Sequence, residues 1–555
     1  MLSLGSGDDI TLTPDGRTAV LEGVSGKPRW ILRSPGRFDL QDLSVSLPIE
    51  TGPVQVVCEV DYLVDLPIDT FPNEVPPFPS PPAFKLDVVP GFEAMQLPLT
   101  VAEMPTGLAW RKDGSLVVAS LKGRIFNARD TDKDSLEDSL TSVSYDMATP
   151  YGLAVAEVDG PDGKRREVVD VIDKTALVRL HDDDGDGFCE RSEVVADGWG
   201  HTDDYHDWAV GLPKIAGGGY YVALPCQQDE RDEAKAKWRG KGLRLLPRTP
   251  TQDDPRPYSI EPFCGGLRFP MGLAVNREGA LFASDNQGNY NPFNEINHLR
   301  DGKRFGFINK LEAKPEFSPP VESPAIELPH PYTRSVNGMC FLYTPEAHSA
   351  SGKSRFGPFE GHLVGCEYND KSLFRMSLEK IGDTYQGAVY PMTVLPAGGA
   401  PSFEGPTVCE ISPTGDIYVG NMQDSGWGGG RNTGSIVRLR PNGKWPAGIR
   451  EIRAQSDGFV IEFTEPVAKA TAENRKNYSL EAFRRISTPQ YGGSDVDRGP
   501  VKVAKLQAAG DGRSVRITVD ALKAGFCYEF HLSNFAEKDK TFFPAEAFYT
   551  MKRVP

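Results

Sequence analysis

The chain has 555 residues, and its 61 Lys plus Arg against 77 Asp plus Glu give a net charge of -16 at pH 7. Because this charge repels phosphate backbones and anionic membranes, we expect no nucleic-acid partner. No run of about 18 apolar residues occurs, so no membrane-spanning segment is predicted. No signal peptide is predicted either, because the first residues lack a basic segment followed by an apolar core. The eight cysteines form no C-x-x-C pair, which argues against a zinc ribbon or an attached haem.

Short alternating apolar runs separated by Gly, Pro and Asp fill residues 1–71 and predict a small N-terminal β-rich domain. Next, the proline-dense stretch FPNEVPPFPSPP predicts an extended, stiff segment. We therefore assign residues 72–100 as a linker.

One pattern of short strands recurs six times across residues 101–446. It is clearest in residues 266–299, which read as an entry loop, an apolar strand, a polar turn, a second strand, a polar loop and a third strand. A glycine marks the first strand of each of the first five units, at Gly107, Gly152, Gly211, Gly272 and Gly338. Gly405 opens the sixth unit. Intervals of roughly 45 to 67 residues are typical of propeller blades with inserted loops. We therefore predict an all-β fold with a six-bladed β-propeller; a β-sandwich with coincidental GLA segments is the alternative.

The last part of the chain, residues 450–555, alternates apolar and polar residues with period two between polar turns. This pattern predicts a small C-terminal β-sandwich of immunoglobulin-like shape. We expect a structural or adhesive role for it rather than a catalytic one.

Two acidic loops carry the pattern of a calcium site. In DDDGDGFCERSE, alternate carboxylates around a turn glycine can surround one hard cation, and the flanks favour a blade loop over an EF-hand. DTDKDSLED has the equivalent place in the preceding blade, with Lys133 and Ser135 departing from the pattern. The predicted ligands are Asp182, Asp184, Asp186, the Phe188 carbonyl and Glu193, with Glu190 as an alternative late ligand, and, in the second loop, Asp130, Asp132, Asp134 and Asp138. Both sites would be structural, and a solvated acidic turn is the alternative.

A ligand site is expected where the loops before first strands and after second strands converge at one end of the central channel. The candidates are residues 201–208, 285–297 and 330–337, with Glu367, Tyr368, Asp424 and Trp427 in the equivalent loops of blades five and six. Within HTDDYHDW, His206 beside Asp207 is a candidate general base, because imidazole titrates near neutrality and a carboxylate can orient it. A metal site on His201, His206 and Asp203 or Asp204 is an alternative, as is an ordinary loop hydrogen bond. No G-x-S-x-G, P-loop or dinucleotide fingerprint supports a serine hydrolase, NTPase or NAD enzyme.

LRFPMGLA, NEIN and KRFGF resemble motifs of the glucose/sorbosone dehydrogenase family, six-bladed propellers that include soluble quinoprotein sugar dehydrogenases using pyrroloquinoline quinone (PQQ) and calcium. Phe269 stands where the family has Asn. The resemblance implies that His206, aided by Asp207, accepts the substrate's hydroxyl proton while hydride passes to the quinone. The cofactor contacts assigned on this basis are Arg268, Asp285, Asn286, Gln287, Tyr290, Arg334 and Asn337.

Residues 90–550 also resemble large secreted proteins of planctomycete-type bacteria described as membrane-bound-dehydrogenase-like, some fused to cytochrome c modules. This resemblance implies a secreted or periplasmic location and a cytochrome c as electron acceptor.

Three functions stay open at this point. The first is a PQQ-dependent, quinoprotein-like dehydrogenase that oxidises a sugar or a sugar-derived alcohol or aldehyde. The second is a non-redox lyase or hydrolase acting on polysaccharide, with His206, Tyr290 or His330 as acid or base. The third is a calcium-stabilised, non-catalytic carbohydrate-binding scaffold. In each case the partner is a small or polymeric carbohydrate.

Overall fold

A computed structural model describes residues 80–555 apart from 161–162, 203–206, 227–237, 310–311, 313–315, 331, 350–351, 395–399, 428 and 539. Before residue 80 it describes residues 2–3, 9–22, 29–34, 37–41, 44–46 and 57–61. The chain divides into two compact units, Met1–Asn73 and Glu74–Pro555. No described helix is long and apolar enough to span a membrane.

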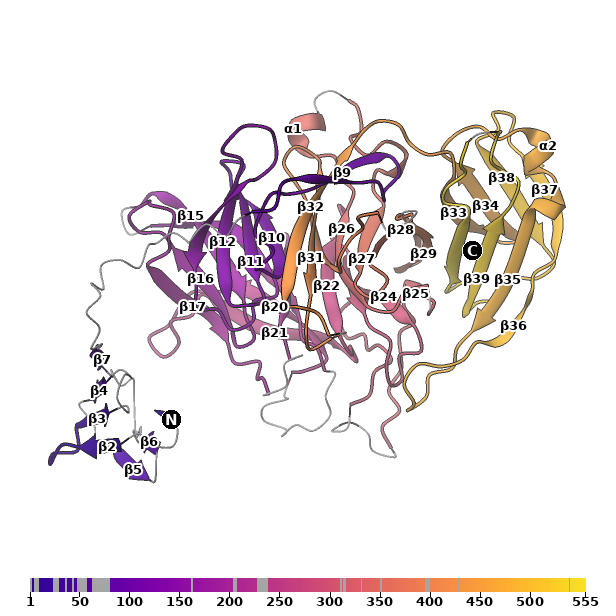
Figure 1. Ribbon diagram of the computed structural model, residues 1–555. Coiled ribbons are helices and arrows are strands. Elements are labelled where there is room, and N and C mark those ends of the chain that lie inside the picture. The colour runs from indigo at the N-terminus through magenta and orange to yellow at the C-terminus, as the bar shows by residue number, and fades with distance from the viewer. Residues whose placement is uncertain are drawn as a thin grey trace. The chain divides into compact units, whose positions relative to one another are not determined.

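The first unit consists of two small antiparallel sheets (Figure 1). The three-stranded sheet has the order β1 (Leu2–Ser3), β6 (Ser44–Ser46), β5 (Asp39–Gln41). The four-stranded sheet has the order β2 (Asp9–Leu12), β3 (Thr18–Glu22), β4 (Arg29–Arg33), β7 (Val57–Asp61). Ala19 and Leu32, which are paired across β3 and β4, are buried.

The second unit contains six antiparallel blades, each with the first strand of the repeat on the inside (Figure 1). Blade one consists of β10 (Pro105–Trp110), β11 (Leu116–Ser120), β12 (Arg124–Arg129) and β13 (Ser139–Ser144). Blade two consists of β14 (Leu153–Asp159), β15 (Arg165–Ile172), β16 (Ala176–His181) and β17 (Arg191–Asp197). Blade three consists of β18 (Val210–Lys214), β19 (Tyr220–Ala223), β20 (Lys241–Pro247) and β21 (Tyr258–Gly265). Blade four consists of β22 (Pro270–Val275), β23 (Leu281–Asp285), β24 (Asn294–Leu299) and β25 (Ile326–Leu328). Blade five consists of β26 (Val336–Phe341), β27 (Leu363–Glu367), β28 (Ser372–Ile381) and β29 (Thr384–Pro391). Blade six contains β30 (Pro406–Ile411), β31 (Ile417–Gln423) and β32 (Thr433–Pro441). The sheet order confirms the predicted six-bladed, all-β propeller.

Blade six is completed by the start of the second unit. There β9 (Phe92–Gln96) pairs with β32, from Val437 opposite Gln96 to Pro441 opposite Phe92, and β8 (Phe84–Leu86) pairs with β9. These strands lie in residues 72–100, for which the sequence suggested a linker. Strand β9 pairs on its other side with a strand more than 300 residues away, and such a distant partner leaves no signal in the local sequence. Joining an early strand to the last blade closes the ring.

The hydrophobic cores lie between neighbouring blades. Second strands such as β11 and β23 are buried at every residue because both of their faces meet other sheets. One cluster joins Val117 of blade one to Val171 of blade two, and another joins Leu177 of blade two to Val222 of blade three. Each blade is therefore stabilised by the two beside it.

The repeated glycines are the places where the inner strands approach one another most closely. A Cβ added at Gly152 would lie 1.8 Å from Gly211 O, and one at Gly272 would lie 2.5 Å from Asn337 O and 2.8 Å from Gly338 Cα. A Cβ at Gly338 would in turn lie 2.7 Å from Thr407 O. Glycine recurs here because a side chain would hold the backbones of adjacent blades apart.

The C-terminal part is a sandwich of two four-stranded sheets. One sheet has the order β33 (Ile449–Gln455), β34 (Gly458–Phe463), β38 (Ser514–Val519), β37 (Val503–Ala508), and the other has the order β36 (Val496–Pro500), β35 (Tyr478–Arg484), β39 (Phe526–Leu532), β40 (Glu546–Met551). The strands can be lettered A to G in chain order from β33 to β40, with β36 as an extra strand C′. The first sheet then has the order ABED and the second the order C′CFG, which is the strand order of immunoglobulin-like sandwiches. Short helices occur at α1 (Glu346–Ser349), Gly357–Phe359, α2 (Lys469–Ala472) and Arg475–Asn477.

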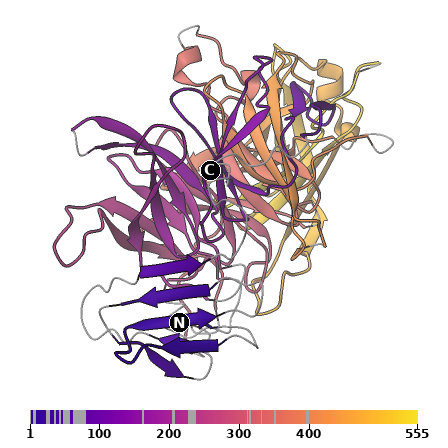
Figure 2. The same cartoon turned by 60° about the vertical axis from the view of Figure 1, so that its left-hand side comes forward.

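The sandwich continues the sheet of blade five. Strand β40 pairs with β29, with Gly387 opposite Thr550 and Val389 opposite Phe548, so eight strands form one sheet. Figures 1 and 2 show the yellow C-terminal strands next to the later blades. The buried Arg375 of blade five donates from Nη2 to the Ile449 carbonyl at 2.9 Å. The sandwich is therefore joined to the propeller by backbone pairing as well as by side chains.

The glycine contacts predict a large effect of one added methyl group. Gly272→Ala should destabilise the protein by about 1–3 kcal/mol, because the new Cβ overlaps the backbone of blade five and the core cannot expand freely. Gly510→Ala is the matched control, since no atom lies within 4 Å of its added Cβ. Thermal unfolding should show a lower midpoint for the first variant and an unchanged one for the second; equal midpoints would contradict the close approach of the inner strands.

Candidate functional site

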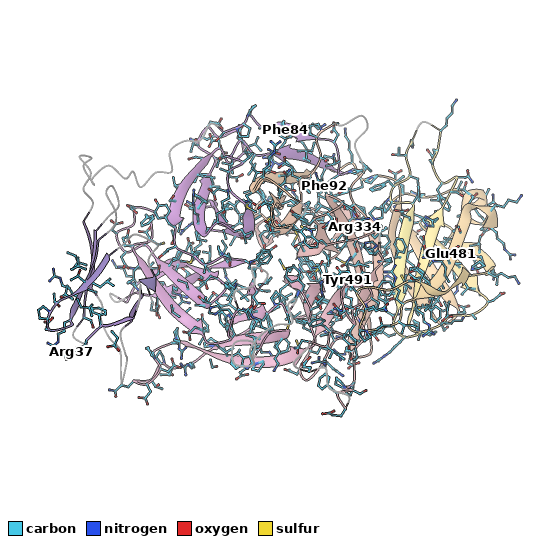
Figure 3. The ribbon with its side chains drawn as sticks, turned by 60° about the horizontal axis from the view of Figure 1, so that its bottom comes forward. Arg37, Phe84, Phe92, Arg334, Glu481 and Tyr491 are labelled. Carbon is cyan, nitrogen blue, oxygen red and sulfur yellow. The ribbon has the colours of Figure 1, made fainter. Side chains whose placement is uncertain are left out.

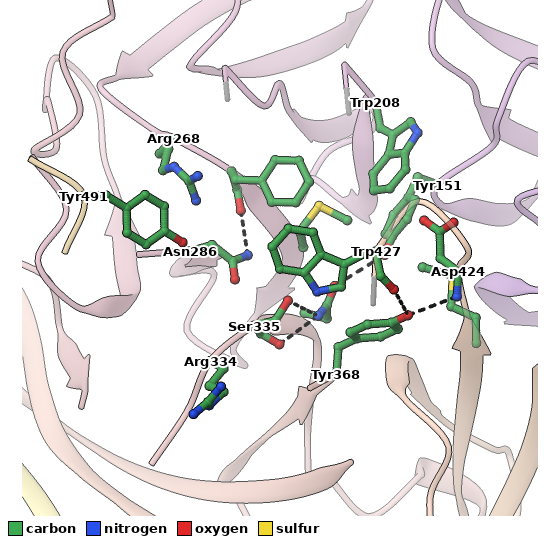
Figure 4. A pocket seen from close by; sticks show the side chains of 14 residues that line it. Tyr151, Trp208, Arg268, Asn286, Arg334, Ser335, Tyr368, Asp424, Trp427 and Tyr491 are labelled. Carbon is green, nitrogen blue, oxygen red and sulfur yellow. Dashed lines mark hydrogen bonds between the residues drawn. The ribbon is translucent and has the colours of Figure 1, made fainter. Parts of the chain in front are cut away.

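A pocket lies at one end of the central channel (Figure 4). The inner strands of all six blades line the channel itself. The pocket lining comes from residues at the ends of first and second strands and from one C-terminal loop: Tyr151, Trp208, Arg268, Phe269, Met271, Asn286, Arg334, Ser335, Asn337, Tyr368, Met422, Asp424, Trp427 and Tyr491. These loops of the propeller are the ones that the blade pattern brings to one end of the channel.

Two buried carboxylates hold the arginine-bearing loops in place. Asp285 ends the second strand of blade four and accepts hydrogen bonds from the backbone N–H groups of Arg268 (3.0 Å) and Phe269 (2.6 Å). Glu367 ends the second strand of blade five and accepts from the backbone N–H groups of Arg334 (2.8 Å) and Ser335. The same position in adjacent blades thus fixes the loop that carries each arginine.

Burial raises the pKa of both carboxyl groups. It raises the pKa of Asp285 to about 6 and that of Glu367 to about 7, and the backbone N–H donors offset part of this shift. Neither side chain is exposed. Asp285 therefore holds the backbone of this loop and is not among the residues that line the pocket.

The two arginines give the pocket a positive side. Arg268 is nearly buried, donates from Nη1 to the Gln287 carbonyl at 2.5 Å, and has its guanidinium carbon 5.1 Å from the centroid of the Tyr491 ring. A Cβ at Gly288 would lie 2.0 Å from Arg268 Nε, so this glycine leaves room for the side chain. Arg334 is half exposed, with its Nε 3.9 Å from Asp370 Oδ1. Guanidinium groups are the usual partners of carboxylates and phosphates.

Aromatic rings form the opposite walls. Tyr151 and Trp208 stack with centroids 4.9 Å apart and planes 16° apart, and Phe269 lies 5.9 Å beyond Trp208. Tyr368 accepts from the backbone N–H of Asp424 at 3.0 Å. Figure 4 shows Arg268 and Tyr491 on one side of the pocket and Trp208, Tyr151 and Asp424 on the other. A flat ligand with negative groups on one edge matches this arrangement.

Of the other predicted cofactor contacts, some line the pocket and others lie behind its lining. Asn286 lines the pocket and donates from Nδ2 to the Phe269 and Val336 carbonyls, and Asn337 lines it through β26. Gln287 is buried and its carbonyl holds Arg268. Tyr290 has a φ of 63° and its backbone N–H donates to Thr488 O. Gln287 and Tyr290 therefore shape the loop and are not part of the lining.

The predicted base lies outside the described residues, as do Asp203 and Asp204. Asp207, next to His206 in the sequence, is fully buried and accepts from the Thr202 N–H at 3.1 Å. Its Oδ2 is 3.7 Å from Nε of the buried Arg239, which also donates to the Trp208 carbonyl at 2.8 Å. Asp207 thus fixes the start of blade three just before Trp208 enters the pocket.

Several lining residues carried no sequence signal of their own. Met271 and Met422 belong to strands, and Tyr151 precedes a strand, so each looks like an ordinary core residue in the sequence. Tyr491 belongs to the C-terminal sandwich, in a loop between β35 and β36. No pattern in the sequence connects that loop with the propeller.

The two acidic loops are alike in detail. The backbone N–H groups of residues 185 and 187 donate to Asp182 (2.6 and 3.0 Å), and those of residues 133 and 135 donate to Asp130 (2.6 and 2.9 Å). The same positions have positive φ in both loops: 86° and 98° in the first, 67° and 73° in the second. Carboxylate oxygens within 4.8 Å of one another come from Asp182, Asp184, Asp186 and Glu190 in the first loop and from Asp130, Asp132 and Asp134 in the second.

Two of the remaining predicted calcium ligands, Glu193 and Asp138, have other partners. Glu193 lies on β17, where its Oε2 is 2.8 Å from His181 Nε2, whereas Glu190 belongs to the cluster of carboxylates. Asp138 accepts from the Thr131 N–H at 2.9 Å. Phe188 donates its own N–H to Asp186 Oδ1 at 2.7 Å.

No protein-family model and no curated protein sequence matches the chain. Comparison with solved structures returns an oxidoreductase (glucose dehydrogenase) of Thermus thermophilus, 21% identical, with a TM-score of 0.42 over 63% of this chain and 99% of that one. The soluble aldose sugar dehydrogenase of Escherichia coli in its apo-form is 18% identical, with a TM-score of 0.41 over 63% and 100% of the two chains. The PQQ-bound aldose sugar dehydrogenase of Streptomyces coelicolor is 16% identical, with a TM-score of 0.39 over 65% and 100%.

The raised pKa of Glu367 predicts a pH dependence of stability. Its pKa in the folded protein lies above that of an unfolded glutamate, so the folded state favours the protonated form and ionisation costs stability. The free energy of unfolding should therefore fall as the pH rises from about 4 through 7, by up to about 3 kcal/mol from this group.

Glu367→Gln should lose less stability than the wild type between pH 5 and pH 8, because an amide does not ionise. Glu346→Gln, at an exposed glutamate of α1, should keep the wild-type slope. Denaturant unfolding at the two pH values measures the difference, and parallel profiles for Glu367→Gln and wild type would refute it.

Proposed function

We propose that the pocket binds a flat, anionic quinone of the PQQ type and that the protein oxidises a sugar or a sugar-derived alcohol or aldehyde. One observation carries this proposal: the guanidinium groups of Arg268 and Arg334 and the stacked rings of Tyr151 and Trp208 line one pocket at the end of the channel. It is one of the three functions that the sequence left open.

The donor set fits such a cofactor. PQQ is a planar tricyclic quinone with three carboxylates, and the pocket offers two guanidinium groups and several aromatic side chains to such a molecule. Arg268 and Arg334 would pair with the carboxylates, and the faces of Trp208 and Phe269 would pack on the rings. When bound, the quinone supplies the acceptor for two electrons from the substrate.

The chain's own residues would bind and orient the substrate. The Asp424 carboxylate and the Asn286 and Asn337 amides line the pocket and can form hydrogen bonds with sugar hydroxyl groups. His206 remains the proposed general base that accepts the hydroxyl proton at a ring nitrogen. Asp207 would act by fixing the segment that leads into Trp208. The cytochrome c acceptor and the secreted or periplasmic location stay predictions.

We also propose that the two acidic loops bind calcium and stabilise blades one and two. The support is the clustering of carboxylate oxygens and the shared turn geometry, which Lys133 and Ser135 adopt at positive φ although glycine favours it. A cation would balance the repulsion between neighbouring carboxylates in each loop.

The cofactor proposal predicts quinone binding that depends on the pocket arginines. Titration of the protein with PQQ and calcium should change the quinone absorbance, and sugars should then reduce an artificial electron acceptor. Arg268→Ala and Arg334→Ala should each weaken binding about tenfold or more, the cost of a charge-assisted hydrogen bond. Arg165→Ala, at an exposed arginine of β15, should bind as the wild type does.

His206→Ala should bind the quinone but lose turnover, because it removes only the proposed base. Absence of quinone binding, or of turnover with a broad panel of sugars, would refute the proposed reaction.

The calcium proposal predicts a melting temperature that falls on chelation and recovers with added calcium, because a ligand of the folded state stabilises it. Asp182→Asn and Asp130→Asn should each reduce this response by removing a charged ligand. Asp253→Asn, at an exposed aspartate of another turn, should respond as the wild type does. A melting temperature that is indifferent to chelator would count against both loops as calcium sites.

A further inference from the structure

The C-terminal sandwich extends a loop onto the propeller. Residues 485–493 lie between β35 and β36 and contact residues 288–292, the loop after the second strand of blade four. Hydrogen bonds that join the two loops include Tyr290 N–H to Thr488 O (2.8 Å), Gly492 N–H to Gly288 O (3.0 Å), Asn289 Nδ2 to Pro489 O (2.6 Å) and Ser487 Oγ to Tyr290 O (2.7 Å). Asn289 and Tyr491 also form an antiparallel bridge. This backbone pairing sets where Tyr491 lies.

A buried arginine anchors the base of the same loop. Arg485 donates from Nη2 to the His330 carbonyl (2.8 Å) and from Nη1 to the Pro292 carbonyl (3.1 Å), and its guanidinium lies 4.7 Å from the Phe293 ring centroid. Its side chain is 6% exposed, and its Nε is 2.8 Å from Asp495 Oδ1. The loop is therefore fixed to blade four and is not a free surface hairpin.

Tyr491 lines the pocket from this loop yet remains 60% exposed. Trp427, from the loop after the second strand of blade six, lines the same pocket and is 42% exposed. Figure 3 labels Tyr491 and Arg334 in the propeller region and Glu481 of β35 in the sandwich. Two large aromatic rings therefore stand at the mouth of one pocket with much of their surface in water.

We propose that Tyr491 is a substrate-contacting residue and that it forms, with Trp427, an aromatic clamp for a sugar ring outside the pocket. The inference rests on the proposed function for the class of substrate. The C–H faces of a sugar ring pack on aromatic faces, and Tyr and Trp offer large rigid surfaces with a polar end. Because the clamp lies at the rim, the ligand it fits is an oligosaccharide or the end of a polysaccharide, with its terminal unit in the pocket.

The alternative is that Tyr491 serves only to pack against Arg268. The cation–π contact would account for a ring near the guanidinium, but the ring also lines the pocket while most of its surface faces water. Tyr491→Phe keeps the ring over Arg268 and Tyr491→Ala removes it, so the pair of variants separates ring stacking from the hydroxyl group.

The test is glycan binding by calorimetry in the absence of quinone, so that its outcome does not depend on the proposed reaction. The probes are neutral and acidic oligosaccharides of one to six units from glucan, mannan, galactan, xylan and uronan. At least one series should bind the wild type, with the hexasaccharide about tenfold tighter than the monosaccharide. Tyr491→Ala and Trp427→Ala should each lose this gain with length, and Tyr491→Phe should keep it.

Tyr145→Ala is the matched control, because Tyr145 is 47% exposed and is not among the pocket-lining residues. Its binding should match the wild type. Absence of binding to every probe, or a gain with length that survives in Tyr491→Ala, would overturn the clamp. If the wild type shows this gain in glycan affinity with length but does not bind the quinone, only the proposed reaction is refuted.

Discussion

The structure depends on the close contact of inner strands at glycine. Between blades two and three, and again between blades four, five and six, the backbone of one inner strand occupies the space that a Cβ on its neighbour would need. Hydrogen bonds accompany these contacts: Thr106 Oγ1 donates to Pro150 O at 2.6 Å, Ser284 Oγ to Asn337 O at 2.8 Å and Thr407 Oγ1 to Pro105 O at 3.0 Å. The last of these joins blade six to blade one. Because the inner strands are fixed this tightly, the loops at their ends meet at one place.

The pocket is built on that convergence. Asp285 and Glu367 end equivalent second strands and hold the loops of Arg268 and Arg334 by their backbone N–H groups. The C-terminal sandwich adds the last side, because β40 extends blade five and the loop before β36 reaches blade four. A domain whose sequence suggested a structural role is thus part of the candidate site. The sandwich is held in position by both blade four and blade five.

Much of this could be predicted from the sequence. The six first strands, the six second strands and the six third strands are marked by short apolar runs, and the repeated glycines gave the blade count. Fourth strands such as β17 (RSEVVAD) were missed because they are half exposed and polar. Strand β9 was missed because its partner β32 is far away in sequence. Arg334 and the amides of the pocket were found from loop position and Arg268 from the family resemblance, whereas Tyr491 depends on tertiary pairing that no local pattern encodes.

The central claim is that Arg268, Arg334 and the aromatic walls around Trp208 form a single site for a planar anionic cofactor, closed on one side by Tyr491. A crystal structure of the protein grown with PQQ and calcium tests this claim most directly. Quinone density should lie between the Trp208 ring and the two guanidinium groups, with the Tyr491 loop still paired to residues 288–292. Density for the quinone elsewhere, or a pocket that stays empty at saturating quinone, would contradict it.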